Sequence, residues 1–446
     1  QTRRLAHENR AAVAMKYLHD DGGLEKLSSQ QLIKEENTKR LFNLLNRGRE
    51  MSRADLVRMT GLSPTTVSAL VDELQQADLV LETGLAPKAH SGRKAINLRI
   101  RADGRQIPVF SLNRWGVRFT LYNLAYETLE TCFVAHAADQ YGGFAQDAPD
   151  ANPDTGDDYP ALMEDILKNR AQRYDPDRAV AICISHPGIY LESEEDFSLS
   201  AMHVTFTKAA MSALEARLGV PLFLGNSSMS LAYAEKKHLD RAGQPIDDLI
   251  YLNVCEGVGA GIVSGGEIFT GSDNTAGEIG HVSIDYNGRR CACGNRGCLE
   301  QFVNTDAVLE TVKRVAAQRQ CTELLDMAQD SYDNITLELI GQAYDAGVAA
   351  VVAAIDDIAA MLFAGMYSAV CLTGIKRIVL GGGIEKLGAG FLHKLISFTK
   401  QNRRHILMRD VCFTYTLTGF KGDSLGIAEY FIDKGYEITL KGAHRA

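Results

Sequence analysis

The first hundred residues carry apolar positions at helical spacing in three successive segments, residues 28–47, 52–60 and 65–76. Intervals of three and four residues place side chains on one face of a helix, so each segment predicts an amphipathic helix. The inward face of the second helix is expected to carry Ala54, Leu56, Val57 and Met59, and that of the third Val67, Leu70, Val71 and Leu74.

The residues between these segments are those of a helix–turn–helix. Ser52 is a favourable N-cap for the second helix, and Gly61 suits a left-handed residue at its end. Ser63 followed by Pro64 suits the start of the third helix. That helix then presents short side chains outward near its N-terminal end, namely Thr65, Thr66, Ser68 and Ala69. In a helix–turn–helix the later of the two helices is the recognition helix, and here that is the helix over residues 65–76.

Residues 79–82 and 92–98 predict two strands around a flexible tip at 84–90, which would form a wing. Lys88, His90, Arg93 and Lys94 would be available there for phosphates or a minor groove. We therefore predict a DNA-binding domain with contacts from Ser63, Thr65, Thr66, Ser68, Lys88, Arg93 and Lys94. The alternative is a small helical dimerisation domain with a solvated hairpin.

From residue 106 onward, strand-like and helix-like segments alternate, with glycine-rich turns after the strands. This alternation predicts α/β layers, and its repetition predicts two similar halves around a cleft. We expect a helix over 161–173, one long alanine-rich helix around 340–372, and a mobile Asp-, Gly- and Pro-rich loop over 139–159. The predicted domains are a helical extension (1–27), a winged helix–turn–helix (28–105) and a two-lobed body (106–446).

Charge and cysteine usage add to this division. Residues 1–105 carry 18 Lys and Arg against 13 Asp and Glu, whereas the whole chain has a net charge of -9. A basic end on an acidic body suits contact with a polyanion. Six of the nine cysteines stand singly among apolar residues, which indicates core thiols in a reducing, cytoplasmic compartment.

Two apolar features bear on the membrane. The first ten residues contain no long apolar segment, so no secretory signal is expected there. The most apolar stretch, residues 348–370, is interrupted by Asp356 and Asp357. A buried helix is therefore expected rather than membrane insertion.

The other three cysteines lie close together, with the spacing Cys291-x-Cys293-x4-Cys298, and His281 precedes them by ten residues. Three thiolates and one imidazole complete a tetrahedral Zn²⁺ site and leave no open position for catalysis. We predict a structural zinc site at these four residues. The alternative is a cluster of reduced loop cysteines.

Several motifs together give the chain a family resemblance. They are the winged helix, His186-Pro187-Gly188, residues 257–263 (GVGAGIV), residues 276–281 (AGEIGH), the cysteine run ending in Glu300, and residues 378–383 (IVLGGG). With these motifs the chain resembles transcriptional regulators of the ROK family (repressors, open reading frames and sugar kinases). The resemblance implies a two-lobed α/β actin-like ATPase fold, a sugar site between the lobes, a structural zinc, and homodimers or homotetramers.

The resemblance also maps Asn226, Glu278, His281 and Glu300 onto positions that bind sugar hydroxyls. Glu278 and Glu300 have an alternative role as carboxylates that brace the zinc loop. Met202 stands where the family commonly has a polar sugar contact. We therefore expect a modified effector, a weakly bound sugar, or no small ligand.

Three departures from the kinases of the family indicate that kinase activity is lost, so the chain is not an enzyme and neither ATP nor Mg²⁺ is expected. Ser111 stands in place of a metal-binding Asp, and Asn113 and Arg114 replace the two glycines of the same motif. Glu256 stands in a phosphate loop, where its charge repels a triphosphate. Ser227 stands in place of the catalytic Asp, and an unassisted serine is no base at neutral pH.

The sequence thus predicts a cytoplasmic, homo-oligomeric repressor of carbohydrate uptake or catabolism genes, which binds a double-stranded operator and responds to a sugar-like effector. Two alternatives remain. One is a sugar kinase with a fused DNA-binding domain, and the other is a regulator controlled by a protein partner such as a membrane sugar transporter component. The sequence does not give the operator or the identity of the effector, and it leaves an activator open as the alternative to a repressor.

Overall fold

The computed structural model describes residues 29–46, 50–85, 96–113, 116–135, 159–189, 196–199, 204–272, 274–402, 405–419 and 421–434. The chain forms two compact units. The first contains residues 1–187, 191–225 and 427–446, and the second contains residues 188–190 and 226–426. The predicted helical extension (1–27) lies outside the described residues, and the predicted domain limits stay predictions.

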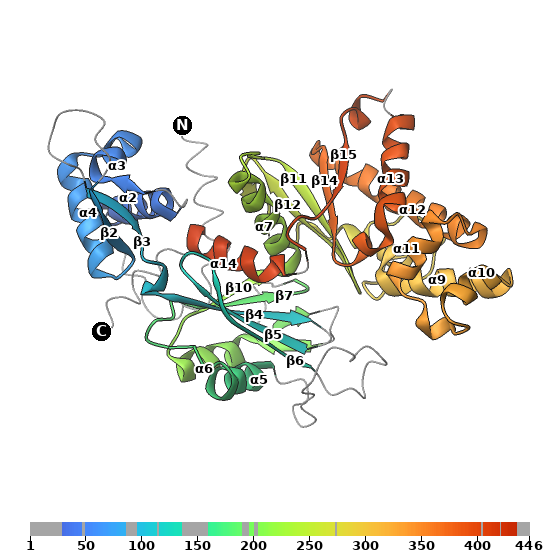
Figure 1. Cartoon of the computed structure of the whole chain (residues 1–446), viewed down its shortest axis with the longest axis horizontal. Helices are drawn as coiled ribbons and strands as arrows, with labels where there is room; N and C mark the ends of the chain where they lie inside the picture. Colours follow the sequence, from blue (N-terminus) through green and yellow to red (C-terminus); the bar gives the residue numbers. More distant parts are fainter. Residues whose placement is uncertain are drawn as a thin grey trace. The chain divides into compact units, whose positions relative to one another are not determined.

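The winged helix belongs to the first unit (Figure 1). Its helices are α2 (Ser29–Asn46), α3 (Arg53–Thr60) and α4 (Pro64–Gln76), and its strands β1 (Met51–Ser52), β2 (Val80–Leu85) and β3 (Ile96–Ile100) pair in the order β1-β3-β2. The stripe predicted for the third helix is confirmed, because Val67, Leu70, Val71 and Leu74 are all buried.

One part of the predicted inward face is wrong. In α3 the buried residues are Leu56 and Thr60, whereas Met59 is 48% exposed and Ala54 is exposed too. A short helix buries a narrow stripe, and Thr60 takes the inward place because its hydroxyl bonds the carbonyl of Leu56 at 2.6 Å. The predicted wing residues Lys88, His90, Arg93 and Lys94 lie outside the described residues, and the returning strand is described from Ile96.

The rest of the first unit is built on a five-stranded sheet with the order β10-β7-β4-β5-β6. Strands β4 (Gln106–Asn113), β5 (Gly116–Asn123) and β6 (Thr128–Ala135) are antiparallel neighbours, while β7 (Ile182–His186) runs parallel to β4 and is followed by β10 (Leu222–Asn226). Helices α5 (Tyr159–Asp165) and α6 (Lys208–Leu218) lie on one side of this sheet (Figure 1). A short hairpin, β8 (Asp196–Leu199) and β9 (Val204–Thr207), completes the strands.

The second unit repeats this arrangement. Its sheet has the order β13-β12-β11-β14-β15. Strands β11 (Leu249–Val254), β12 (Val258–Ser264) and β13 (Glu267–Ile268) are antiparallel, and β14 (Arg377–Gly381) and β15 (Cys412–Tyr415) run parallel to β11. Each sheet therefore begins with a three-stranded antiparallel meander. The next strand in the sequence then pairs in parallel with the free edge of the meander's first strand. The predicted pair of similar halves is confirmed.

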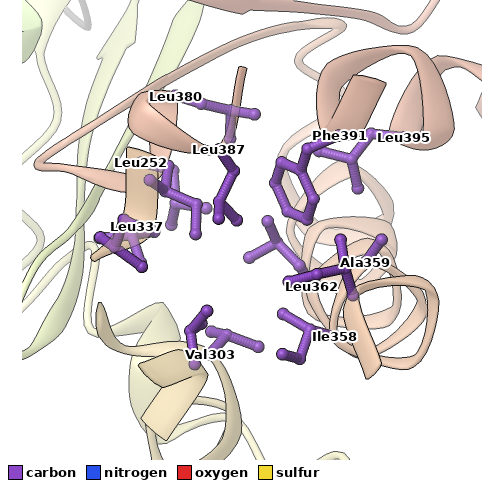
Figure 2. Close-up of a cluster of buried hydrophobic side chains, with 14 of the residues drawn as sticks. Leu252, Val303, Leu337, Ile358, Ala359, Leu362, Leu380, Leu387, Phe391 and Leu395 are labelled. Carbon is purple, nitrogen blue, oxygen red and sulfur yellow. The ribbon is translucent and has the colours of Figure 1, made fainter. Parts of the chain in front are cut away.

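Helices surround the second sheet: α7 (Ser227–Arg241), α8 (Glu300–Val303), α9 (Thr305–Gln318), α10 (Thr322–Met327), α11 (Leu337–Asp345), α12 (Ala349–Thr373) and α13 (Gly388–Asn402). Helix α14 (Gly422–Lys434) follows the last strand. The core lies where α12 and α13 face the sheet, with Leu362 and Phe391 opposite Leu252 and Leu380 (Figure 2).

Two predicted helices differ from those observed. The alanine-rich segment forms α11 and α12 rather than one helix, with a turn at Gly347 between them. The helix predicted over 161–173 begins at Tyr159 and continues as a π-helical turn over Ile166–Arg170. Tyr159 is buried, so it belongs to the core and not to the predicted loop.

Helix α12 is the one helix among the described residues that is long and apolar enough to cross a membrane. Half of its most apolar window is buried, and Ile355, Ile358, Leu362 and Met366 belong to the core of the second unit. The helix is therefore a core element. Not every lone cysteine is a core thiol as predicted, because Cys183 and Cys321 are buried while Cys371 and Cys412 are exposed.

Candidate functional sites: a recognition helix and a cysteine–histidine cluster

A network of hydroxyl groups opens the recognition helix α4. Ser63 is its N-cap, with the Oγ accepting from the backbone N–H of Thr66 at 3.1 Å. The same Oγ lies 2.8 Å from the Oγ1 atoms of both Thr65 and Thr66. Thr65 and Ala69 are exposed, and Ser68 is half-buried. Four predicted DNA contacts thus share the first turn and a half of one exposed helix.

Short-range contacts set the position of α4 against α3. Ser52 and Asp55 form a capping box at the start of α3, and Gly61 ends it with a φ of 72°, a conformation that costs glycine little. Arg53 then joins three elements, since its guanidinium bonds Asp72 in α4 at 3.0 Å and Glu82 in β2 at 2.9 Å. These contacts hold the two helices and the wing strand as one block.

The four predicted metal ligands come together in the second unit. The ligand atoms of His281, Cys291, Cys293 and Cys298 all lie within 4.8 Å of one another. The Sγ atoms of Cys293 and Cys298 are 3.6 Å apart, and His281 Nδ1 lies 3.7 Å from Cys291 Sγ. A tetrahedral zinc with bonds of about 2.3 Å to sulfur requires edges of about 3.8 Å. The group therefore fits a tetrahedral metal ion in both donor chemistry and size.

Polar neighbours that were not predicted from the sequence support this group. Asn295 donates to the backbone carbonyl of His281 at 3.2 Å, and Gln301 Nε2 lies 3.7 Å from Cys291 Sγ. The backbone N–H of Asn295 also lowers the pKa of the Cys293 thiol, which favours the thiolate that a metal binds. Their position within and just after the cysteine run was the available signal.

His281 lies between the cysteines and a carboxylate. Its Nδ1 faces Cys291, and its Nε2 is 3.8 Å from Glu278 Oε2. Burial raises the pKa of Glu278, the charge of His281 opposes this rise, and the charge of Glu300 adds to it. Glu300 opens α8, and its Oε2 accepts from the backbone N–H of Val258 at 3.0 Å. Glu278 and His281 are therefore neighbours, and Glu300 is near enough for its charge to act on Glu278.

Asn226 has a different local role from these three residues. It is the N-cap of α7, with Oδ1 accepting from the backbone N–H groups of Ser228 at 2.8 Å and Met229 at 3.2 Å. Its Nδ2 donates to the carbonyl of Gly188 at 2.8 Å. Within the described part of the chain, the second amide hydrogen has no acceptor.

The three positions that differ from the kinase pattern lie in a strand, in a turn and at the start of a helix. Ser111 is buried in β4, and its hydroxyl has no hydrogen-bond partner in the part of the chain that the structure describes. Cys255, Glu256 and Gly257 form the tight turn between β11 and β12, closed by a bond from Cys255 N–H to Gly257 carbonyl at 2.9 Å. Ser227 is the first residue of α7. Arg114, Trp115 and Met202 lie outside the described residues.

Curated proteins similar to this chain include repressors and other transcriptional regulators. A protein named xylose repressor from Caldicellulosiruptor bescii is 27% identical over 83% of this chain and 88% of its own length. The DNA-binding transcriptional dual regulator NagC of Escherichia coli is 26% identical over 82% of this chain and 84% of its own length.

Solved structures share the fold. A ROK family transcriptional regulator described as a homologue of the E. coli MLC protein matches 92% of this chain and 99% of its own, with a TM-score of 0.73 and 24% identity. A ROK family glucokinase from Streptomyces griseus matches 73% of this chain and 98% of its own, with a TM-score of 0.59 and 21% identity. The predicted fold class is confirmed.

Family models identify the two parts of the chain. The model for winged helix-turn-helix DNA-binding domains matches residues 34–80. The ROK family model matches residues 148–421, which is more than half of the chain. The protein is therefore a member of the ROK family that carries an N-terminal winged helix–turn–helix.

Proposed function

We propose that this protein is a DNA-binding transcriptional repressor of carbohydrate uptake or catabolism genes, and that a sugar-type effector controls its DNA binding. The observation that carries the proposal is that one ROK chain has both an exposed, hydroxyl-rich recognition helix and a group of side chains suited to bind sugar hydroxyls, namely Glu278, His281 and Glu300. Relatives named xylose repressor and N-acetylglucosamine repressor support it. The protein acts in the cytoplasm as a homodimer or homotetramer on a double-stranded operator.

The recognition helix would read DNA through its first turns. Thr65 and the half-buried Ser68 offer short hydroxyls to base edges or phosphates, while Ser63 holds Thr65 and Thr66 in place. Lys88, Arg93 and Lys94 of the wing would add phosphate or minor-groove contacts. Hydroxyl contacts are permissive, so the backbone contacts supply much of the affinity and make it salt-dependent.

The effector would bind at Glu278, His281 and Glu300, with the remaining amide hydrogen of Asn226 as a further donor. Carboxylates accept hydrogen bonds from hydroxyl groups, and two carboxylates in one cluster suit a polyol better than an anion. His281 Nε2 faces the same cluster.

Zinc would join His281 Nδ1 to the three thiolates. When bound, the ion supplies rigidity and holds the imidazole in one orientation, so that Nε2 stays directed toward Glu278. The metal site has four protein ligands and thus serves structure rather than catalysis. Through His281, the metal site links the fold of the cysteine loop to Glu278 and Glu300, which together with His281 we call the effector cluster.

We further propose that the chain has lost kinase activity. Ser227 offers no base in place of a carboxylate, and the first turn of α7 provides it with no activating histidine or carboxylate neighbour in sequence. The buried hydroxyl of Ser111 is a poor substitute for a carboxylate that binds Mg²⁺. A sugar that binds here would therefore be sensed and not consumed.

The proposal is tested by fluorescence anisotropy with the full chain and a labelled duplex of its own promoter region, titrated with D-xylose, N-acetylglucosamine and D-glucose. We expect salt-sensitive binding that one of the sugars weakens. A Thr65→Asp variant, which places a negative charge at the reading surface, should lose binding at least tenfold. Arg314→Gln, at an exposed residue of α9, makes the same change of −1 in net charge away from the recognition helix and is the control. Absence of duplex binding would contradict the proposal.

The loss of kinase activity has a separate test. The purified chain is incubated with Mg²⁺-ATP and each of the three sugars, and ADP release is followed. No sugar-dependent ADP release above a protein-free blank is expected. Stoichiometric turnover of any sugar would restore the fused sugar kinase as the better description.

A further inference from the structure

The first unit contains a junction between the winged helix and the sheet that follows it. Residues 101–105 connect them and touch both. On one side Arg101 N–H bonds the carbonyl of Leu79 at 2.9 Å, and the guanidinium of Arg101 pairs with Asp78 at 2.5 Å. On the other side Leu124 N–H, just after β5, bonds the carbonyl of Ala102 at 3.0 Å. The linker is therefore bonded into both neighbours along its length.

Gly104 shows how closely these parts approach. A Cβ at this position would lie 1.9 Å from the carbonyl oxygen of Asp78, so only glycine fits. Asp78 itself, just beyond the end of α4, has a φ of 63°, which is uncommon for a residue other than glycine. A third contact ties α2 to the same sheet, since Asn46 Nδ2 donates to Tyr126 Oη at 2.8 Å. Such contacts fit a joint with one preferred arrangement rather than a free linker.

Arg105 is the centre of this joint. Its Nη2 donates to the carbonyl of Ala77 at 3.2 Å, and its Nη1 donates to the carbonyl of Asp177 at 3.2 Å. Ala77 is the C-cap of the recognition helix, where the backbone carbonyls lack partners and a cation is favourable. The planar guanidinium can hold two carbonyls at a fixed angle, which a lysine cannot do.

Asp177 belongs to a turn that leads directly to β7. Gln106 holds this turn on both of its sides, because its side chain bonds Arg173 carbonyl at 2.9 Å and Asp175 N–H at 2.8 Å. Strand β7 (Ile182–His186) then pairs in parallel with β4, so the turn is anchored to the first-unit sheet. Arg105 thus joins the C-terminal end of the recognition helix to the turn that precedes strand β7.

We infer that Arg105 is a positioning residue for DNA binding: it fixes the orientation of helix α4 on the first-unit sheet, so that the helix moves with that sheet as one body. The inference rests on the proposed function. It has a measurable consequence, because two recognition helices in a dimer must meet half-sites about 34–36 Å apart. A dimer whose winged helices have a fixed orientation on the first-unit sheet binds only a narrow range of half-site spacings. Loss of the Arg105 contacts should widen that range.

The test uses full-length protein and a duplex selected by the wild-type chain from a random-sequence pool. The spacer between its half-sites is lengthened by one, two and three base pairs, and a duplex with one half-site is included. Wild type is expected to lose at least tenfold in affinity on lengthening by two base pairs. Arg105→Met, which keeps the length of the apolar stem, is expected to lose less than threefold, with single-half-site affinity within twofold of wild type.

Two further variants separate positioning from folding. Arg105→Lys keeps the charge beside Ala77 but cannot bridge both carbonyls, so it should resemble Arg105→Met. Arg314→Met, at an exposed arginine in α9, should resemble wild type. If Arg105→Met does not fold, Asn46→Ala is used instead, and it is expected to widen the spacing profile by a smaller factor.

An unchanged spacing profile in a folded variant overturns the inference. So does an equal loss of affinity for all duplexes, including the single half-site, because that result describes a general defect of the domain. If the wild-type chain selects no duplex at all, the proposed function fails rather than the role of Arg105.

Discussion

The recognition helix and the cysteine–histidine cluster are assembled in opposite ways. In the first, Ser63 positions Thr65 and Thr66 through bonds that span two and three residues. In the second, His281 is joined to Cys291 and Cys298 across ten and seventeen residues, and Glu300 reaches back to Val258 across 42. The geometry of the first site depends on the few residues at one helix end, whereas that of the second depends on the folding of the whole unit.

This difference predicts how each region fails. A local cap is lost with one side chain and disturbs little else, because its neighbours remain helical. A cluster that gathers distant segments would be cooperative once a metal is bound, because each ligand would then be held by the others. Loss of the cap at Ser63 should therefore change DNA affinity only a few-fold, and damage to the cysteine–histidine cluster should remove structure.

Removal of the metal gives the largest expected effect. Cys298→Ser, at a fully buried thiol, is expected to lower bound zinc from one ion per chain to none and to destabilise the second unit by several kcal/mol. Cys371→Ser, at an exposed cysteine outside the cluster, should leave both quantities unchanged. Metal content is measured by mass spectrometry of digested protein and stability by urea unfolding. Full stability of the zinc-free variant would show that the cluster is not cooperative.

Acid provides a second way to separate the two units. His186, in β7 of the first unit, is 3% exposed, and burial lowers its pKa to about 4. In the unfolded chain the imidazole of His186 becomes protonated near pH 6.5, whereas in the folded chain it stays neutral down to about pH 4. The free energy of unfolding therefore decreases as the pH falls from 6.5 to 4. The full loss is about 3 kcal/mol.

The measurement is urea unfolding of wild type and His186→Asn between pH 7.5 and 4, which cancels the titration of other groups. The stability of wild type should fall by about 3 kcal/mol more than that of the variant over this range. A constant difference between the two proteins would show that His186 is not buried in its neutral form.

The effector cluster should change in function with little change in fold. Glu278→Gln removes one of two neighbouring carboxylate charges and keeps a side chain of equal size, so stability should be unchanged or slightly higher. Sugar affinity, measured by calorimetry, should fall at least tenfold because a charged acceptor is lost. Zinc content is the control. An unchanged sugar affinity would assign Glu278 to support of the metal loop instead.

The smallest effect is expected at the helix cap. Ser63→Ala removes the bond to Thr66 N–H and frees both threonine hydroxyls, which should cost about 1 kcal/mol of stability and a few-fold in duplex affinity. Ser68→Ala, one turn further along the same helix, should change stability by less than about 0.5 kcal/mol. Similar stability losses in the two variants would show that Ser63 does not serve as a cap.

The same contrast explains what could be predicted from the sequence. Caps, glycine turns and the buried stripe of α4 depend on near neighbours, so they follow from spacing. The metal ligands also follow, because cysteine is rarely grouped without a reason. The break between α11 and α12 was missed because alanine-rich sequence favours helix throughout. The roles of Arg105, Asn295 and Gln301 were missed because their partners depend on tertiary structure.

The most direct test of the account is the reciprocity of DNA and sugar binding. The sugar that releases the promoter duplex is identified, and its affinity is measured by calorimetry with free protein and with the protein–duplex complex. When two binding sites in one protein are coupled, each ligand changes the affinity for the other by the same factor, typically about 5–150. We predict that duplex weakens sugar binding by the same factor by which sugar weakens duplex binding. Equal sugar affinity with and without the duplex would contradict control of DNA binding by this site.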